Sequence, residues 1–320
     1  MEFPGGKRFC FSILDDTDDA TVENVKPVYD YLYECGLRTT KTVWPMDCPE
    51  GSRVFFAAET LQDKPYCDFA HELVSRGFEL ALHGATMESS TRERTMRGLE
   101  FLQREFGLSP RLHCNHAFNR DNLYWGLERL QSHFLRAVFR RVWVESGESY
   151  EGAMERSPFF WGDLCRAHVD YVRNFTFTDL DLLKVNPEMP YRRANTPYVK
   201  YWFSTSDAED VHEFNRLLTV ERIDGLEATG GVCIISTHLG KGYARNGKLH
   251  ADTAKILRYL STKDGWFPPV SDILDHLRAQ RTVDSNMSWL SMTRLAYQFL
   301  FDKILRWLDK RKARSRFEKR

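Results

Sequence analysis

The chain has 320 residues, with 45 basic residues (Lys and Arg) balanced by 45 acidic residues (Asp and Glu). This balance gives no global charge that would favour a nucleic-acid partner. The length suits one barrel-sized domain or two smaller ones, and no apolar run is long enough to span a bilayer. The seven cysteines are scattered without a C-x-x-C pair, and the first residues lack the apolar core of a signal peptide. We therefore expect a cytoplasmic protein with free thiols.

A short apolar run, residues 8–14, stops in four carboxylates within residues 15–19. One interpretation is a buried strand that delivers acidic side chains to the open end of a parallel sheet, where such folds place their chemistry. The other is an acidic cap for the helix that follows. The motif alone does not decide between the two.

Strand-like and helix-like segments alternate along the first half of the chain. Apolar periodicity predicts helices that end at Gly36 and Gly77, a helix over 91–106 and another over about 121–134. Short β-prone runs between them predict strands over 39–44, 78–82 and 111–114. This alternation indicates βα units and a parallel sheet.

Residues 136–229 are less regular, and regularity returns with the apolar run 230–237, which is typical of a central parallel strand. Helices near 250–261 and 270–281 follow.

Four of these predicted strands end in a polar group able to do chemistry, namely Asp15/Asp16, His83, His116 and His238. In a parallel barrel all four ends open on one face. A carboxylate with two imidazoles suits Zn²⁺ or an iron-type ion better than Mg²⁺ or Ca²⁺. A second carboxylate and a further histidine would remain for proton transfer, so the set is suited to activating water for hydrolysis.

The residues also resemble a known family. From about residue 9 to residue 277 the chain is similar to the polysaccharide deacetylase superfamily, closest to a divergent branch that shares the stretches at residues 115–126 and 171–177. The resemblance implies an α/β fold, a distorted (β/α) barrel of about seven parallel strands, here followed by a C-terminal amphipathic helix.

The family's first motif, an apolar strand ending in Asp-Asp, matches residues 11–16. The resemblance implies that Asp15 is the general base and that Asp16 is a metal ligand. It implies His238 as the general acid, since that histidine ends the family's last buried strand. On this interpretation Asp18 and Asp19 cap the following helix.

The second motif, His-x-x-x-His, begins at His83 but has Met87 at its second histidine position. A thioether is a poor ligand for a hydrolytic zinc ion. Glu88 or His116 would have to replace it, and we expect Asp16, His83 and His116 as the three ligands. The family's Arg-x-Pro-Tyr motif is absent.

The function implied by the resemblance is that of a metal-dependent hydrolase. It would remove an acyl group, in the first place acetyl, from a polysaccharide or lipid-linked glycan in cell-surface polysaccharide synthesis. Zn²⁺ is the expected ion, with Fe, Co and Ni as alternatives. The alternative function, motivated by Met87, is a catalytically inactive barrel that binds glycans or acts as a scaffold.

Several aromatic and basic residues are candidates for substrate binding. Tyr124 and Trp161 could line a sugar groove, and Arg120 and Arg173 could hold an anionic group of the substrate. We expect Trp125 to be a core residue on its helix, and His113 to face away from His116 because strand side chains alternate.

The sequence divides at about residue 284 into a barrel, residues 1–284, and a C-terminal segment, residues 285–320. From Trp289 an apolar helical pattern runs to a basic cluster that begins at Lys310. One interpretation is a helix that lies on an anionic membrane surface through residues 289–320, at the inner face of the membrane. The other is a helix packed on the barrel or in a dimer.

Overall fold

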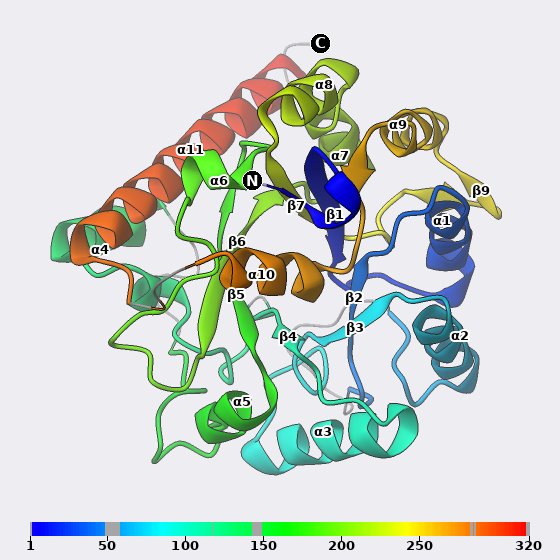
Figure 1. Cartoon of the computed structure of the whole chain (residues 1–320). Helices are drawn as coiled ribbons and strands as arrows, with labels where there is room; N and C mark the ends of the chain where they lie inside the picture. Colours follow the sequence, from blue (N-terminus) through cyan, green and yellow to red (C-terminus); the bar gives the residue numbers. More distant parts are fainter. Residues whose placement is uncertain are drawn as a thin grey trace.

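A computed structural model describes residues 2–48, 58–116, 118–142, 149–281, 284 and 286–317, without the side chains of residues 142 and 309–317. The basic side chains expected at 310–320 therefore lie outside the described part. Figure 1 shows helices arranged around a central set of strands.

Seven parallel strands close into a barrel, as the family resemblance implied. They are β1 (Phe9–Asp15), β2 (Thr40–Val43), β3 (Glu79–Leu82), β4 (Leu112–His113), β5 (Tyr171–Phe177), β6 (Tyr201–Asp207) and β7 (Val232–Thr237). Pairing of β1 with β7, from Cys10 opposite Val232 to Asp15 opposite Thr237, closes the ring. Every residue of β1 and β7 is buried, which explains why both read as continuous apolar runs. The short β10 (Gly265–Trp266) pairs with the start of β1.

Helices surround this barrel (Figure 1). They are α1 (Val22–Glu34), α2 (Lys64–Ser75), α3 (Arg92–Phe106), α5 (Gly162–His168), α6 (Leu182–Val185), α7 (Val211–Leu217), α8 (Val220–Thr229) and α9 (Ala251–Ser261). Smaller elements are a 3₁₀ turn at Pro4–Gly6 and an antiparallel ribbon of β8 (Ala244–Arg245) and β9 (Lys248–Leu249).

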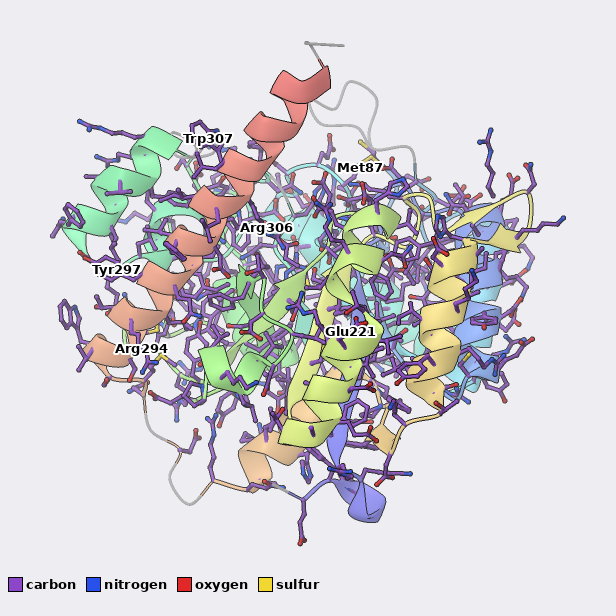
Figure 2. All side chains as sticks on the ribbon, turned by 90° about the horizontal axis from the view of Figure 1, so that it is seen from above. Met87, Glu221, Arg294, Tyr297, Arg306 and Trp307 are labelled. Atoms are coloured by element: carbon purple, nitrogen blue, oxygen red, sulfur yellow. The ribbon has the colours of Figure 1, made fainter. Side chains whose placement is uncertain are left out.

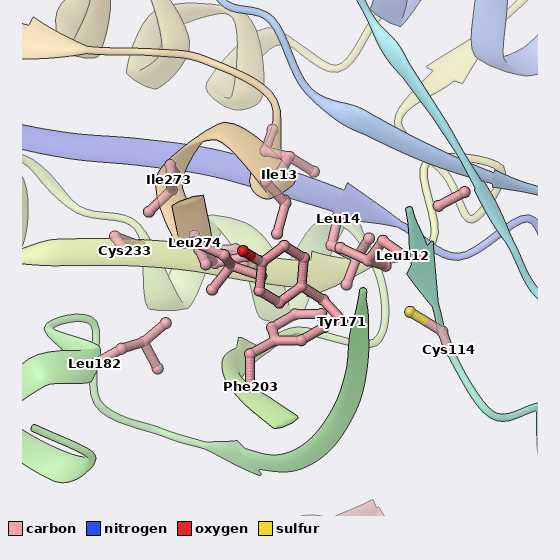
Figure 3. Close-up of a cluster of buried hydrophobic side chains, with 14 of the residues drawn as sticks. Ile13, Leu14, Leu112, Cys114, Tyr171, Leu182, Phe203, Cys233, Ile273 and Leu274 are labelled. Carbon is pink, nitrogen blue, oxygen red and sulfur yellow. The ribbon is translucent and has the colours of Figure 1, made fainter. Parts of the chain in front are cut away.

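Helix α10 (Val270–Ala279) covers the amino end of the barrel. Its Ile273 and Leu274 are buried in the same cluster as Tyr171 and Phe203, near the starts of β5 and β6 (Figure 3). The Tyr171 hydroxyl donates to the carboxylate of Asp275 on α10 at 2.5 Å. The amino end is thus filled by side chains, and the opposite end is left for a site.

The helix predicted over 121–134 is wrong. This stretch forms a 3₁₀ turn at Gly126–Arg129, and α4 begins only at His133 and ends at Val142. The Asn122 side chain bonds the backbone N–H and C=O of His116, and Tyr124 has a φ of 48°. Local side-chain-to-backbone bonds and a left-handed residue here outweigh the apolar periodicity.

The C-terminal helix α11 (Trp289–Phe317) packs against β5 and α4. Phe299 lies with its ring centroid 4.8 Å from that of Phe175, and Asp302 accepts hydrogen bonds from the N–H and hydroxyl of Thr178. Another side of the helix stays exposed and apolar, including Leu290 at 72% and Phe301 at 61%. No helix within the described residues is both long and apolar enough to cross a membrane.

We predict that Phe299→Ala detaches or loosens α11, because Phe299 is fully buried and large-to-small changes of this kind cost about 3–5 kcal/mol. Urea unfolding and limited proteolysis measure the effect. Phe301→Ala removes the same ring from the exposed side of the same helix and should change stability by less than about 0.5 kcal/mol. Equal effects of the two changes would contradict the packing of α11.

Candidate functional site

The carboxyl ends of the strands open into a cavity of about 510 Å³. Asp16 after β1, His83 after β3, His116 after β4 and His238 after β7 all line it. The register explains the convergence, because the N–H of Asp16 donates to the carbonyl of Thr237 at 2.8 Å. Likewise Cys114 donates to Leu82 at 2.9 Å, which brings the loop of His116 beside His83.

The residue at the centre of this group is Asp18. Its Oδ1 lies 3.5 Å from Nε2 of His83 and 3.4 Å from Nε2 of His116, and its Oδ2 lies 3.3 Å from Nε2 of His238. Burial alone would raise the pKa of Asp18, but the three imidazoles hold it well below its usual range. Asp18 is therefore a buried, ionised carboxylate, and its expected role as a helix cap is wrong. The cap of α1 is Thr21, which accepts from Asn24.

The ring nitrogens of His83 are oriented by the backbone. Its Nδ1–H donates to the carbonyl of Cys114 at 3.1 Å, which leaves Nε2 as the lone-pair nitrogen that faces Asp18. Burial lowers the pKa of His83, which favours the neutral imidazole that metal binding requires. The fully buried Trp44 flanks both imidazoles, with ring centroids 5.9 Å from His83 and 5.3 Å from His116.

Asp18, His83 and His116 fit a divalent metal. Their ligand atoms lie within 4.8 Å of one another, and all three residues are buried. Zinc–ligand bonds of about 2.0–2.2 Å at tetrahedral angles would put neighbouring ligand atoms about 3.3–3.6 Å apart, close to the separations around Asp18. Moreover, no donor among the described residues meets hydrogen-bond geometry to the buried Oδ1 of Asp18. One carboxylate and two imidazoles leave a coordination position open.

Asp16 lies beside this triad. One of its oxygens accepts from Nη1 of Arg173 at 2.6 Å, and its other oxygen is 3.9 Å from Nδ1 of His83. The same Arg173 nitrogen also donates to the hydroxyl of Ser236. Burial would raise the pKa of Asp16, but the Arg173 guanidinium together with His83 and His238 outweighs burial and lowers the pKa. Asp16 is thus an ionised carboxylate fixed in orientation, with an oxygen available to the cavity.

Asp15 does not reach the cavity. It is fully buried, and its carboxylate accepts from Nζ of Lys41 at 2.8 Å, the hydroxyl of Tyr29 at 2.9 Å and the N–H of Leu239 at 2.8 Å. Side chains alternate along a strand, so Asp15 points to the layer between the barrel and α1 while Asp16 points inward. The role of base expected for Asp15 therefore has no support in this geometry.

His238 closes the group on the β7 side. Its Nδ1–H donates to the carbonyl of Glu209 at 2.8 Å, so Nε2 faces Asp18. Burial would lower the pKa of His238, but Asp18 and Asp16 outweigh it and raise the pKa to about 9. A cation bound to Asp18 would weaken that attraction and bring the value back toward neutral.

Of the four substrate-binding residues expected from the sequence, Arg173 alone lines the cavity. Arg120 pairs with Glu151 at the surface, with Nη2 2.6 Å from Oε1. Trp161 is buried, and its indole N–H donates to a backbone carbonyl at 2.6 Å. The Tyr124 hydroxyl accepts a backbone N–H at 3.4 Å. These three side chains bond to residues that do not line the cavity.

Met87 stands where the family motif has its second histidine, and its position in the structure is away from the triad. Met87 is buried and does not line the cavity, whereas His116 occupies the third corner of the triad. Glu88 forms an ion pair with Arg94 and does not line the cavity either. His113 donates to the carbonyl of Leu82 and lies against Trp161, outside the cavity.

Several lining residues were missed from the sequence. Trp125 lines the cavity instead of joining a helix core, and α11 contributes a wall through Lys303, Arg306 and Trp307. Figure 2 shows Arg306 and Tyr297 projecting from different sides of α11. Lys303 and Arg306 are two of several polar residues between the apolar positions of this helix, so the sequence did not distinguish them. Their partner Asp207, at the end of β6, is distant in sequence and could not be inferred.

No family model matches this sequence, and no curated protein matches it. Solved structures are similar to it over most of both chains, among them the following two. One is a protein assigned as a polysaccharide deacetylase from Mycobacterium smegmatis, with a TM-score of 0.52 at 13% identity, covering 90% of this chain and 96% of the other. The chain has the polysaccharide deacetylase fold. The second is the PuuE allantoinase, with a TM-score of 0.52 at 16% identity, covering 88% and 94%.

We predict that Asp18→Asn lowers affinity for Zn²⁺ by at least about 100-fold, because it removes the charged ligand of the triad. Isothermal titration and metal content after dialysis measure this. Asp19→Asn, next along the chain, is the matched control and should bind normally. If Asp16→Asn lost the metal and Asp18→Asn kept it, the ligand would be Asp16, as the sequence resemblance implied.

We predict that Asp15→Asn destabilises the fold by about 3–5 kcal/mol, because it leaves the ammonium of Lys41 buried without a counter-charge. Adding Lys41→Met should recover part of that loss, and a double-mutant cycle in urea gives the coupling. Additive losses in the double variant would show that the pair is not coupled.

Proposed function

We propose that this protein is a metal-dependent hydrolase that removes an acyl group, in the first place acetyl, from a saccharide. The observation that supports it most is the arrangement of Asp18, His83 and His116 between a fixed carboxylate, Asp16, and a histidine, His238, in one cavity. This arrangement provides metal ligands, a base and an acid within reach of one another. The similarity in fold to a polysaccharide deacetylase agrees with this function.

Asp18, His83 and His116 would hold the ion, with Zn²⁺ favoured by the one-carboxylate, two-imidazole set and Fe, Co or Ni as alternatives. A divalent ion here would supply Lewis acidity toward the acyl carbonyl and make water more acidic. Asp16 and His238 line the same cavity as these three residues.

The protein's own groups would handle the protons. Asp16, held by Arg173, is proposed as the base that accepts a proton from the attacking water. His238 is proposed as the acid that protonates the leaving amine or alkoxide through Nε2, since its Nδ1–H is committed to the Glu209 carbonyl. This assignment moves the base from Asp15 to Asp16 and the carboxylate ligand from Asp16 to Asp18.

We further propose a glycan under assembly at the cytoplasmic face of a membrane as the substrate, with α11 as the membrane-facing element. In support, α11 exposes Leu290, Tyr297, Phe301 and Leu305 along one side. Aromatic and leucine side chains beside a basic segment are the composition of interfacial helices. The division into a barrel, residues 1–284, and a C-terminal segment, residues 285–320, stays a prediction.

The activity test uses the full chain loaded with Zn²⁺, Co²⁺, Ni²⁺ or Fe²⁺ and measures acetate released from acetylated saccharides. Asp16→Asn and His238→Gln should each lower kcat by about 10²–10⁴-fold, the usual contribution of a general base or acid. His168→Gln, a surface histidine at the end of α5, is the matched control and should leave kcat unchanged.

The alternative function, an inactive barrel that binds glycans or acts as a scaffold, makes the opposite prediction. In that case stoichiometric metal would be absent, and no acetylated saccharide would be hydrolysed whichever ion was added. The affinity for saccharides would then be the same in Asp16→Asn, in His238→Gln and in the unmodified protein.

A further inference from the structure

The outer part of the cavity is strongly basic. Beyond the triad, the described residues that line it include four cations, Arg129, Lys241, Lys303 and Arg306, and two carboxylates, Asp207 and Glu209. The formal excess is two positive charges. An ion on Asp18 would add to it, since Asp16 is already paired with Arg173. A neutral sugar would leave this excess uncompensated.

Two of the cations share one carboxylate. Nη1 of Arg306 lies 2.5 Å and Nζ of Lys303 lies 3.3 Å from the same Oδ2 of Asp207. Burial lowers the pKa of Lys303, and Arg306 and Arg129 lower it further in spite of Asp207. One carboxylate shared by two basic side chains leaves a formal charge of about +1 on this group.

Arg129 adds a rigid, planar cation to the same wall. It is 3% exposed, and its guanidinium lies 3.9 Å from the ring centroid of Trp125 and 4.9 Å from that of Phe299. Stacked guanidinium groups are well suited to bidentate binding of phosphate oxygens. Trp125 and Trp307 also line the cavity, and aromatic faces suit pyranose rings.

We propose that the substrate is an acylated sugar that carries a phosphate group, with the phosphate held between Lys241, Lys303, Arg306 and Arg129 and the acyl group directed at the triad. The charge of the group fits, since a phosphate ester carries up to about two negative charges near neutral pH. A single carboxylate, as in a uronic acid, would offset only half of the excess. The placement of the acyl group rests on the proposed function, whereas the phosphate site does not.

Direct binding tests the phosphate site separately from catalysis. The probes are N-acetylglucosamine 1-phosphate and neutral N-acetylglucosamine, titrated into the full chain by calorimetry. We expect the phosphate ester to bind at least about 10-fold more tightly, the worth of one charge-assisted hydrogen bond. Lys241→Gln and Lys303→Gln should each reduce its affinity about 10-fold. Lys255→Gln, an exposed lysine on α9 with 79% of its side chain accessible, should not.

The Asp18→Asn variant separates this site from phosphate bound by the metal. We expect it to retain the preference for the phosphate ester, because the four cations are unchanged. Equal binding of the two sugars, full affinity in both lysine variants, or loss of the preference in Asp18→Asn would each overturn the proposal. If no sugar is deacylated with any metal but the preference persists, the proposed function fails and the phosphate site stands.

The phosphate could belong to a soluble sugar phosphate or to a lipid-linked one. Two arms of the activity assay distinguish these sources, one with the free ester and one with the same sugar phosphate on a prenyl chain in vesicles. Faster acyl release from the prenyl-linked form assigns the phosphate to a lipid carrier. The opposite order assigns it to a soluble donor.

Discussion

The site depends on one buried carboxylate. Asp18 lies within 3.5 Å of an Nε2 atom from each of three histidines, and these histidines come from the ends of three different strands. A charge in that position is stable only with a positive partner, either a proton on an imidazole or a divalent ion. A divalent ion would satisfy the carboxylate and two imidazoles at once, and it would leave His238 available for the proton transfer that we propose. The rest of the cavity is arranged around this requirement.

The barrel supplies the rigidity that this arrangement needs. The β1–β7 register fixes Asp16 next to His238. On the side of β1 that faces the helices, the hydrogen bonds that Asp15 accepts from Lys41, Tyr29 and Leu239 hold the end of the strand. Two adjacent aspartates therefore have different tasks, because strand alternation turns one outward to the helices and the other inward to the cavity. The ion pair of Asp15 with Lys41 stabilises the end of β1, and the same strand end holds Asp16 in the cavity.

Five of the seven strands, β1 to β4 and β7, could be predicted from the sequence, since they appear as β-prone or apolar runs whose carboxyl ends share one face in a parallel sheet. His83, His116 and His238 were found this way. The closed barrel was implied by the family resemblance, and β5 and β6 lie in a region whose pattern is irregular. Asp18 was missed because it lies in the turn beyond β1, where periodicity carries no information. The role of base was expected at Asp15, whose side chain lies outside the cavity, because a motif match does not report which face of the barrel a strand residue points to. The wall from α11 depends on contacts between distant segments, which no local pattern encodes.

The two ends of the chain contribute different things to this cavity. The candidate metal centre is drawn from the first 116 residues, whereas two of the four cations of the outer wall, Lys303 and Arg306, lie on α11, which is anchored through Phe299. The proposed reaction and part of the proposed recognition are therefore carried by different segments. If the proposed function holds, substitutions along one face of α11 would change which saccharides enter, while the strand ends that carry the proposed metal ligands stay the same. Such a division would let substrate preference vary through the helix without any change in the barrel.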